Sequence, residues 1–186
     1  MLPKKNITHS NSLFALILII LLILSSISCN ANSVIFTSNN TTENYSQIPD
    51  FSLKLIDGSF ITKSDFIEQQ SPYFFHFFSS SCPKCHSELI DLKTILDTNE
   101  YSVTVIAINV STTNTTEHLK TFQENLQLPF NIAEFNNDLI IKLKITEQST
   151  KIAVDKSGNI IYRDGFGQGN PEQWIELFKE LDTEKL

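Results

Sequence analysis

The residues of this sequence with the clearest chemical potential are two thiols in the run Cys82-Pro83-Lys84-Cys85. Thiols at this spacing can form a disulfide and can pass it to another protein through a mixed-disulfide intermediate. Proline favours the first turn of a helix, where its missing N–H has no partner to lose, so the run predicts a helix beginning at the cysteines. There, the helix dipole and the cation of Lys84 lower the pKa of the Cys82 thiol. Cys82 is therefore the predicted nucleophile, and Cys85, one turn further in, is the predicted resolving thiol.

Three other uses of these cysteines remain open from the residues alone. His86 completes the pattern C-x-x-C-H, which attaches c-type haem in exported proteins; Met1 is the only methionine, so a second axial ligand would have to be His76 or His118. A zinc site would need two more ligands from the same three histidines. A purely structural disulfide would close so small a loop that it stabilises little. Because thiol exchange requires none, we expect no metal and no cofactor.

The N-terminus carries the features of an export signal. Residues 1–28 are interpreted as a lipoprotein-type signal peptide, since Lys4 and Lys5 precede an apolar run over 13–24. That run is shorter than the about 20 apolar residues that a membrane span needs. A serine directly before Cys29 resembles a bacterial lipobox, so we expect lipidation of Cys29 and membrane anchoring on the extracytoplasmic side. The two remaining cysteines can then pair only with each other, in a compartment where disulfides persist.

Composition divides the rest of the chain into a tether and one domain. Residues 29–47 are rich in Asn, Ser and Thr and hold few large apolar side chains, which predicts a flexible segment. Residues 48–186 are long enough for a single domain, expected to be monomeric. The chain has 21 acidic and 14 basic residues and a formal net charge of −7. This balance disfavours binding to nucleic acid or to anionic headgroups.

Apolar patterns predict that this domain is of the α/β class. Alternation around a turn predicts a β-hairpin over 51–62, and the aromatic run 73–78 predicts a central strand buried on both faces. We expect His76, within that strand, to be a neutral core histidine, and Ser64 to cap a short helix before the strand. The remaining predicted elements are a helix from the cysteines to about 99, a strand over 103–110, a helix over 116–126, an extended piece over 129–133, a helix over 137–143, a hairpin over 152–162 and a last helix capped at 170–171. This order predicts a central mixed sheet flanked by helices.

With these motifs the sequence resembles the TlpA/ResA-type thioredoxin-like proteins, which are membrane-anchored thiol–disulfide oxidoreductases of the redoxin family. The resemblance spans residues 48 to about 181 and rests on Ile48-Pro49-Asp50-Phe51-Ser52-Leu53, on Phe77-Phe78-Ser79-Ser80-Ser81-Cys82-Pro83-Lys84-Cys85 and on Val154-Asp155-Lys156-Ser157-Gly158. It implies a thioredoxin-like fold with the N-terminal β-hairpin as an extension. It also implies disulfide exchange with exported proteins, including apocytochromes c during cytochrome c maturation. The electrons would come from a membrane or periplasmic thiol donor.

The resemblance implies roles for two further positions. Glu88 stands three residues after Cys85, where ResA-like members have a glutamate that lies near the active site and tunes proton transfer. Its alternative is a solvated carboxylate on the helix surface. Ser149 stands where members have a cis-proline that faces the disulfide and orients the substrate. Because a cis bond before a non-proline residue costs about 3 kcal/mol, we expect a trans or rearranged loop at Gln148-Ser149. That change keeps two alternatives open: a metal or haem carrier using the same cysteines, and a non-catalytic adaptor.

Overall fold

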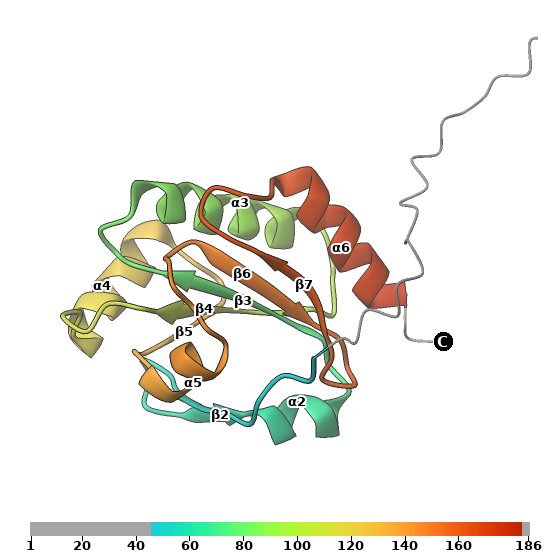
Figure 1. Cartoon of the computed structure of the whole chain (residues 1–186). Helices are drawn as coiled ribbons and strands as arrows, with labels where there is room; N and C mark the ends of the chain where they lie inside the picture. The colour runs from blue at the N-terminus through green and yellow to red at the C-terminus, as the bar shows by residue number, and fades with distance from the viewer. Residues whose placement is uncertain (1–45, 184–186) are drawn as a thin grey trace, which may run out of the picture. The chain divides into compact units, whose positions relative to one another are not determined.

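The structure is a computed structural model that describes residues 46–183. At its centre lies a five-stranded sheet with the strand order β5-β4-β3-β6-β7 (Figure 1). Its strands are β3 (Tyr73–Phe78), β4 (Thr104–Asn109), β5 (Asn131–Ala133), β6 (Thr150–Val154) and β7 (Ile160–Asp164). β3, β4 and β5 run parallel, β6 is antiparallel to β3, and β7 is antiparallel to β6. The predicted central mixed sheet is confirmed.

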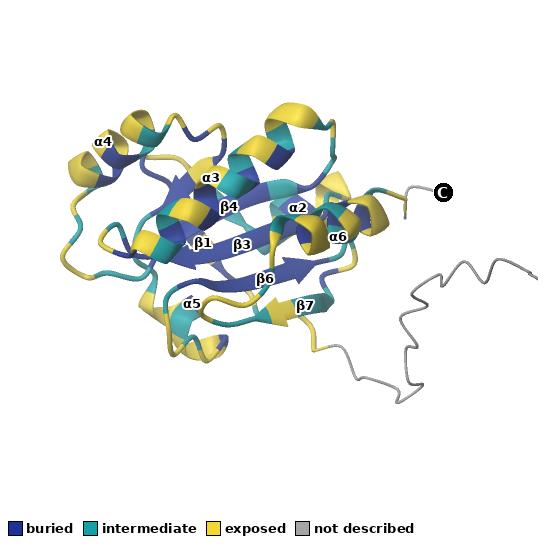
Figure 2. Ribbon diagram, turned by 90° about the horizontal axis from the view of Figure 1, so that it is seen from above, coloured by how far each residue is buried: buried dark blue, intermediate teal, exposed yellow. Residues whose placement is uncertain are grey.

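Helices and a hairpin cover the two faces of this sheet. On one face pack α3 (Pro83–Thr98), α4 (Thr116–Leu126) and α6 (Pro171–Thr183). On the other pack α2 (Lys63–Gln69), α5 (Asn137–Lys142) and the antiparallel hairpin of β1 (Ser52–Lys54) and β2 (Phe60–Thr62). All six residues of β3 are buried, as the aromatic run predicted (Figure 2). Successive side chains of a strand point to opposite faces, and those of β3 alternate between the two cores. The helix α3, which carries Cys85, therefore packs on a strand that is shielded from water.

The predicted elements are confirmed, with one cap to correct. The prediction that Ser64 caps the short helix is wrong, because Thr62 is the N-cap of α2. Thr62 Oγ1 accepts a hydrogen bond from the Asp65 N–H, and the Asp65 carboxylate accepts one of 2.7 Å from the Thr62 N–H. Such a reciprocal capping box requires a partner three residues on, which Thr62 has in Asp65.

The chain joins the sheet near the turn between β6 and β7. The Ile48 N–H donates to the Gly158 carbonyl at 2.9 Å, and the Ile160 N–H donates to the Ser46 carbonyl at 3.1 Å. The predicted signal peptide, the lipidation site Cys29 and most of the predicted tether lie outside the described residues. Between residues 46 and 183, no helix has the length and apolar character needed to cross a membrane.

Candidate active site

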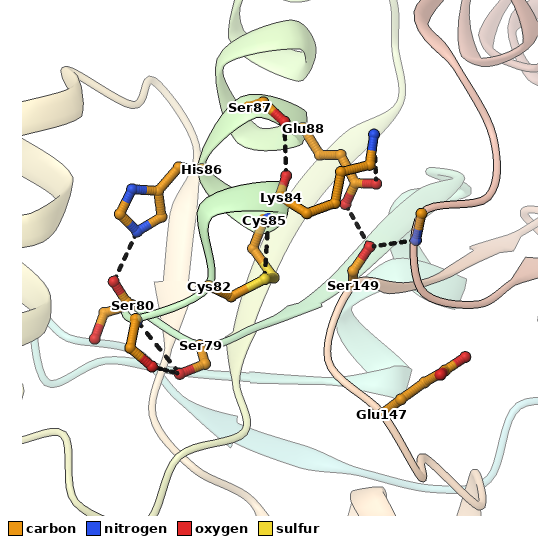
Figure 3. The surroundings of a disulfide bond; sticks show 12 residues. Ser79, Ser80, Cys82, Lys84, Cys85, His86, Ser87, Glu88, Glu147 and Ser149 are labelled. Carbon is orange, nitrogen blue, oxygen red and sulfur yellow. Dashed lines mark hydrogen bonds and ion pairs between the residues drawn. A yellow bond between two sulfur atoms is a disulfide. The ribbon is translucent and has the colours of Figure 1, made fainter.

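Cys82 and Cys85 form a disulfide at the N-terminus of α3 (Figure 3). Cys82 is the N-cap residue, with Pro83 in the first turn, and its Sγ accepts a hydrogen bond of 3.1 Å from the Cys85 N–H. The helix begins where the sequence predicted, at the end of the buried strand β3. Cys82 is 2% exposed and Cys85 is fully buried, so the disulfide is shielded from solvent in this oxidised state.

Glu88 lies one turn beyond Cys85 on the same buried face of α3. The alternative of a solvated carboxylate is wrong, because Glu88 is fully buried. Its position in the helix explains this burial, since Glu88 stands four residues before Leu92, which also faces the core. A carboxylate can be buried there only if the surrounding groups replace the water that it loses.

Four side chains surround the Glu88 carboxylate. The Ser149 hydroxyl donates to Oε2 at 2.7 Å, His76 Nε2 lies 2.8 Å from Oε2, and the ammonium groups of Lys151 and Lys84 lie 3.2 Å and 3.5 Å from Oε1. Burial raises the pKa of Glu88, but the hydrogen bonds from His76 and Ser149 and the nearby positive charge outweigh it and lower the pKa to about 2. To take a proton from a thiol of ordinary pKa near 8.5 would then be uphill by roughly 9 kcal/mol. Glu88 is therefore a fixed negative charge in this state.

His76 is a core histidine, as predicted. It is fully buried, and burial lowers its pKa, so the imidazole is neutral. Because a carboxylate only accepts, Nε2–H donates to Glu88, and Nδ1 has no hydrogen-bond partner among the described residues. The strand order adds a neighbour that the sequence did not suggest, since His76 pairs in register with Lys151 of β6.

Ser149 directly precedes β6 and adopts a left-handed backbone conformation with φ of 63°. No cis peptide bond occurs between residues 46 and 183, so the expected trans bond before Ser149 is confirmed. A non-glycine residue in this conformation costs roughly 1–2 kcal/mol. Hydrogen bonds offset the cost: the Ser149 N–H donates to the Phe77 carbonyl at 2.6 Å, and Ser149 Oγ accepts from the Gly167 N–H at 3.3 Å while donating to Glu88. The loop is thus tied to α3 and to the segment after β7 (Figure 3).

Sequence reasoning missed Lys151, a fully buried cation in β6. A signal was present, because a lysine directly before the apolar run Ile152-Ala153-Val154 of a predicted strand has no favourable environment without an anionic partner. The partner could not be identified without the antiparallel register that places β6 beside β3 and beneath Glu88.

His86, the histidine of the C-x-x-C-H pattern, makes contacts within the protein. His86 Nε2 donates to the Ser80 carbonyl at 2.7 Å, and the His86 ring packs edge-on against Phe122 with 5.0 Å between centroids. His118 Nε2 lies 2.9 Å from the Ser80 hydroxyl. In the part of the chain that the structure describes, no three His, Cys, Asp or Glu side chains are grouped to hold a metal ion. The sulfurs of Cys82 and Cys85 are bonded to each other, as in the oxidised form of a protein that exchanges disulfides.

Comparison with known proteins places this chain in a family. Residues 45–163 match the AhpC/TSA family, and the chain belongs to that family. No curated protein matches the sequence.

Solved structures share the fold at low sequence identity. A putative protein disulfide isomerase from Bacteroides thetaiotaomicron has a TM-score of 0.65 and 16% identity, over 75% of this chain and 89% of that one. A thiol:disulfide interchange protein from Chlorobium tepidum has a TM-score of 0.63 and 21% identity, over 73% and 95%. A secreted disulfide oxidoreductase from Mycobacterium tuberculosis has a TM-score of 0.60 and 15% identity, over 70% and 96%. These likenesses confirm the predicted thioredoxin-like fold, and with the family and the disulfide they support the predicted enzyme class, a thiol–disulfide oxidoreductase.

Proposed function

We propose that this chain is an extracytoplasmic thiol–disulfide oxidoreductase of the TlpA/ResA type, which exchanges disulfides with other exported proteins. The observation that carries the proposal is the Cys82–Cys85 disulfide at the N-terminus of α3. Helix N-termini stabilise thiolates, and a thiolate is both the nucleophile and the leaving group of exchange. Glu88, fully buried one turn beyond Cys85, adds a fixed charge to the same site.

The exchange balances with the two cysteines alone. In the reduced protein, the Cys82 thiolate attacks a substrate disulfide, which forms a mixed disulfide and releases one substrate thiolate. Cys85 then gives its proton to water and attacks the Cys82 sulfur, which forms the Cys82–Cys85 bond and releases the second substrate thiolate. Two electrons have passed from the protein to the substrate. A thiol donor restores the dithiol by the reverse steps.

The site of action follows from the sequence rather than from the described residues. The signal pattern of residues 1–28 and the lipidation expected at Cys29 support a membrane-anchored protein facing the periplasm or the cell exterior. One protein of similar fold is itself described as secreted. The TlpA/ResA resemblance adds apocytochromes c as the candidate substrates and a membrane or periplasmic thiol as the candidate electron donor.

A redox titration tests this function. The purified full-length chain is equilibrated with glutathione buffers, and free thiols are alkylated and counted. We expect one reversible two-electron couple that is lost in Cys82→Ala. In Cys85→Ala we expect mixed disulfides with exported proteins to accumulate, because resolution is blocked. A haem absorption band on the isolated protein, or stoichiometric bound metal, would overturn the proposal in favour of the carrier.

A further inference from the structure

Lys151 is the fully buried cation beneath the redox site. It lies in β6, directly opposite His76 of β3, on the sheet face that packs against α3 and α6. Removing an ammonium from water costs several kcal/mol unless partners replace the lost solvation. The groups that contact the Lys151 ammonium therefore show which parts of the site it holds in place.

The Lys151 ammonium lies in contact with five parts of the site. Its Nζ lies 3.2 Å from Glu88 Oε1 in α3 and 3.1 Å from Asp164 Oδ1 at the end of β7. It donates to two carbonyls of the loop that follows β7, Gln168 at 2.7 Å and Gly165 at 3.2 Å, and lies 3.4 Å from Ser149 Oγ. The Trp174 ring of α6 lies beside it, with its centroid 5.6 Å from Nζ. One cation thus fixes the carboxylate, the Ser149 loop and the loop after β7.

The charges around Glu88 come from every element that packs on it. His76 of β3 is neutral and donates a hydrogen bond, and Lys84 of α3 lies 3.5 Å away with 40% of its side chain exposed to screening water. Asp164 of β7 is a second carboxylate. Burial raises the pKa of Asp164, although the hydrogen bond from Tyr162 and the charge of Lys151 act to lower it. Lys151 is consequently the only fully buried cation among the described residues that contact Glu88.

We propose that Lys151 is a positioning residue of the redox site, whose charge compensates Glu88 so that the Cys85 thiolate can form during resolution. The inference rests on the proposed exchange function. Without the lysine, Lys84, whose side chain is 40% exposed, would be the cation left beside the buried Glu88 carboxylate. A second negative charge on Cys85 would then form one helical turn from a carboxylate with less compensation, and like charges at that distance disfavour ionisation. Lys151 acts through Glu88 and does not touch the reacting sulfurs.

The test follows Cys85 directly. The reduced full-length protein is mixed with dipyridyl disulfide, an uncharged reagent, and the two released pyridine thiones are counted by stopped-flow absorbance between about pH 5 and pH 10. The first release reports attack by Cys82 and the second reports resolution by Cys85. In Lys151→Met we expect the midpoint of the second phase to rise by roughly one pH unit. Its rate at neutral pH should fall about tenfold, because a rise of one pKa unit leaves about a tenth as much thiolate.

Three further variants separate this role from simple structural support. Glu88→Gln should move the midpoint in the opposite direction, and the double variant Lys151→Met/Glu88→Gln should return it toward the wild-type value. Lys179→Met, which removes an exposed cation paired with Glu176 on α6, should leave the midpoint unchanged. If Lys151→Met does not fold, Glu88→Gln and the charge-matched double variant still give the sign of the coupling.

Two results would overturn the inference. One is a Lys151→Met midpoint equal to that of the wild type. The other is a double variant that stays as slow as Lys151→Met, because Lys151 would then not act through Glu88. A wild-type protein that releases no thione would contradict the proposed exchange function itself, so the two failures are distinguishable.

Discussion

Ser149 Oγ donates a hydrogen bond of 2.7 Å to Glu88 Oε2 across 61 positions of the sequence. The resemblance placed both residues near the disulfide and gave each a separate role. In the structure they are in contact, and a hydroxyl stands where the resemblance places a proline ring. The loop that the resemblance places against the substrate is therefore hydrogen-bonded to the buried carboxylate one turn beyond Cys85.

Loss of the Ser149 hydroxyl should destabilise the oxidised protein. A hydrogen bond to a buried charged group contributes about 1.5–3 kcal/mol, so we expect Ser149→Ala to lower the free energy of unfolding by that amount. Urea denaturation at neutral pH measures it. Ser149→Gly is the matched control, since it also lacks the hydroxyl but accepts a φ of 63° without strain. It should be more stable than Ser149→Ala by up to about 1 kcal/mol; losses below roughly 0.5 kcal/mol in both variants would contradict the contribution of this bond.

Glu88 should make the protein acid-sensitive. Its pKa falls from 4.5 to about 2 on folding, so the unfolded chain binds the proton first and stability is lost as pH falls from about 4.5 to about 2. The full loss amounts to about 3 kcal/mol. His76, whose pKa burial lowers, adds a loss of the same sign below its ordinary value of 6.5, while Asp164, whose pKa is raised, contributes with the opposite sign.

Comparison with Glu88→Gln isolates this contribution. Denaturation curves of both proteins are recorded at neutral pH and near pH 3, and the wild type should lose more free energy of unfolding than the variant. Equal losses would show that the Glu88 carboxyl titrates alike in the folded and unfolded chains.

The fold was predictable because its signals are local. The continuous aromatic run of β3 is typical of a strand buried on both faces, and the hairpin residues alternate with the period of a strand. Pro83 indicates the start of the helix that follows Cys82. Thr62 and not Ser64 caps α2, because Asp65 stands three residues after Thr62, whereas the residue three after Ser64 is Ile67, which has no side-chain acceptor.

The centre of the site was only partly predictable. Cys82 and Cys85 lie together because three residues separate them, and that contact needs no tertiary information. Glu88, His76 and Lys151 come from α3, β3 and β6, and their meeting depends on which strand pairs with β3 and in which register. That pairing is set by the whole core, so no local pattern could show that Lys151 lies against Glu88 with His76 beside them.

Membrane attachment should depend on one cysteine that lies outside the described residues. If Cys29 is acylated after removal of residues 1–28, Cys29→Ala should move the protein from the membrane fraction to the soluble extracytoplasmic fraction or the medium. The buried acyl chains are the expected source of retention, since each CH₂ contributes about 0.8 kcal/mol. Immunoblotting of cell fractions measures the change, and unchanged fractionation would contradict the lipobox.

Phe166 should contribute to the grip on protein substrates. It is 50% exposed in the loop after β7, whose backbone is held beside Ser149 by hydrogen bonds from Phe166 N–H to Glu147 at 2.9 Å and from Gly167 N–H to Ser149 at 3.3 Å. An exposed aromatic ring on a fixed loop can bury its surface against a partner, and its loss should lower kcat/KM by about tenfold. We expect Phe166→Ser to slow the reduction of insulin but not that of dipyridyl disulfide, because a small reagent buries little surface against a loop.

The matched control is Phe60→Ser. Phe60 is 62% exposed on β2, in the hairpin that packs on the opposite face of the sheet from α3. Its removal takes away a similar apolar surface without approaching the disulfide, so insulin reduction should be unchanged. An equal loss in both variants would mean that exposed aromatic surface acts non-specifically, whereas a loss confined to Phe166→Ser places the substrate against the loop that Lys151 and Ser149 hold.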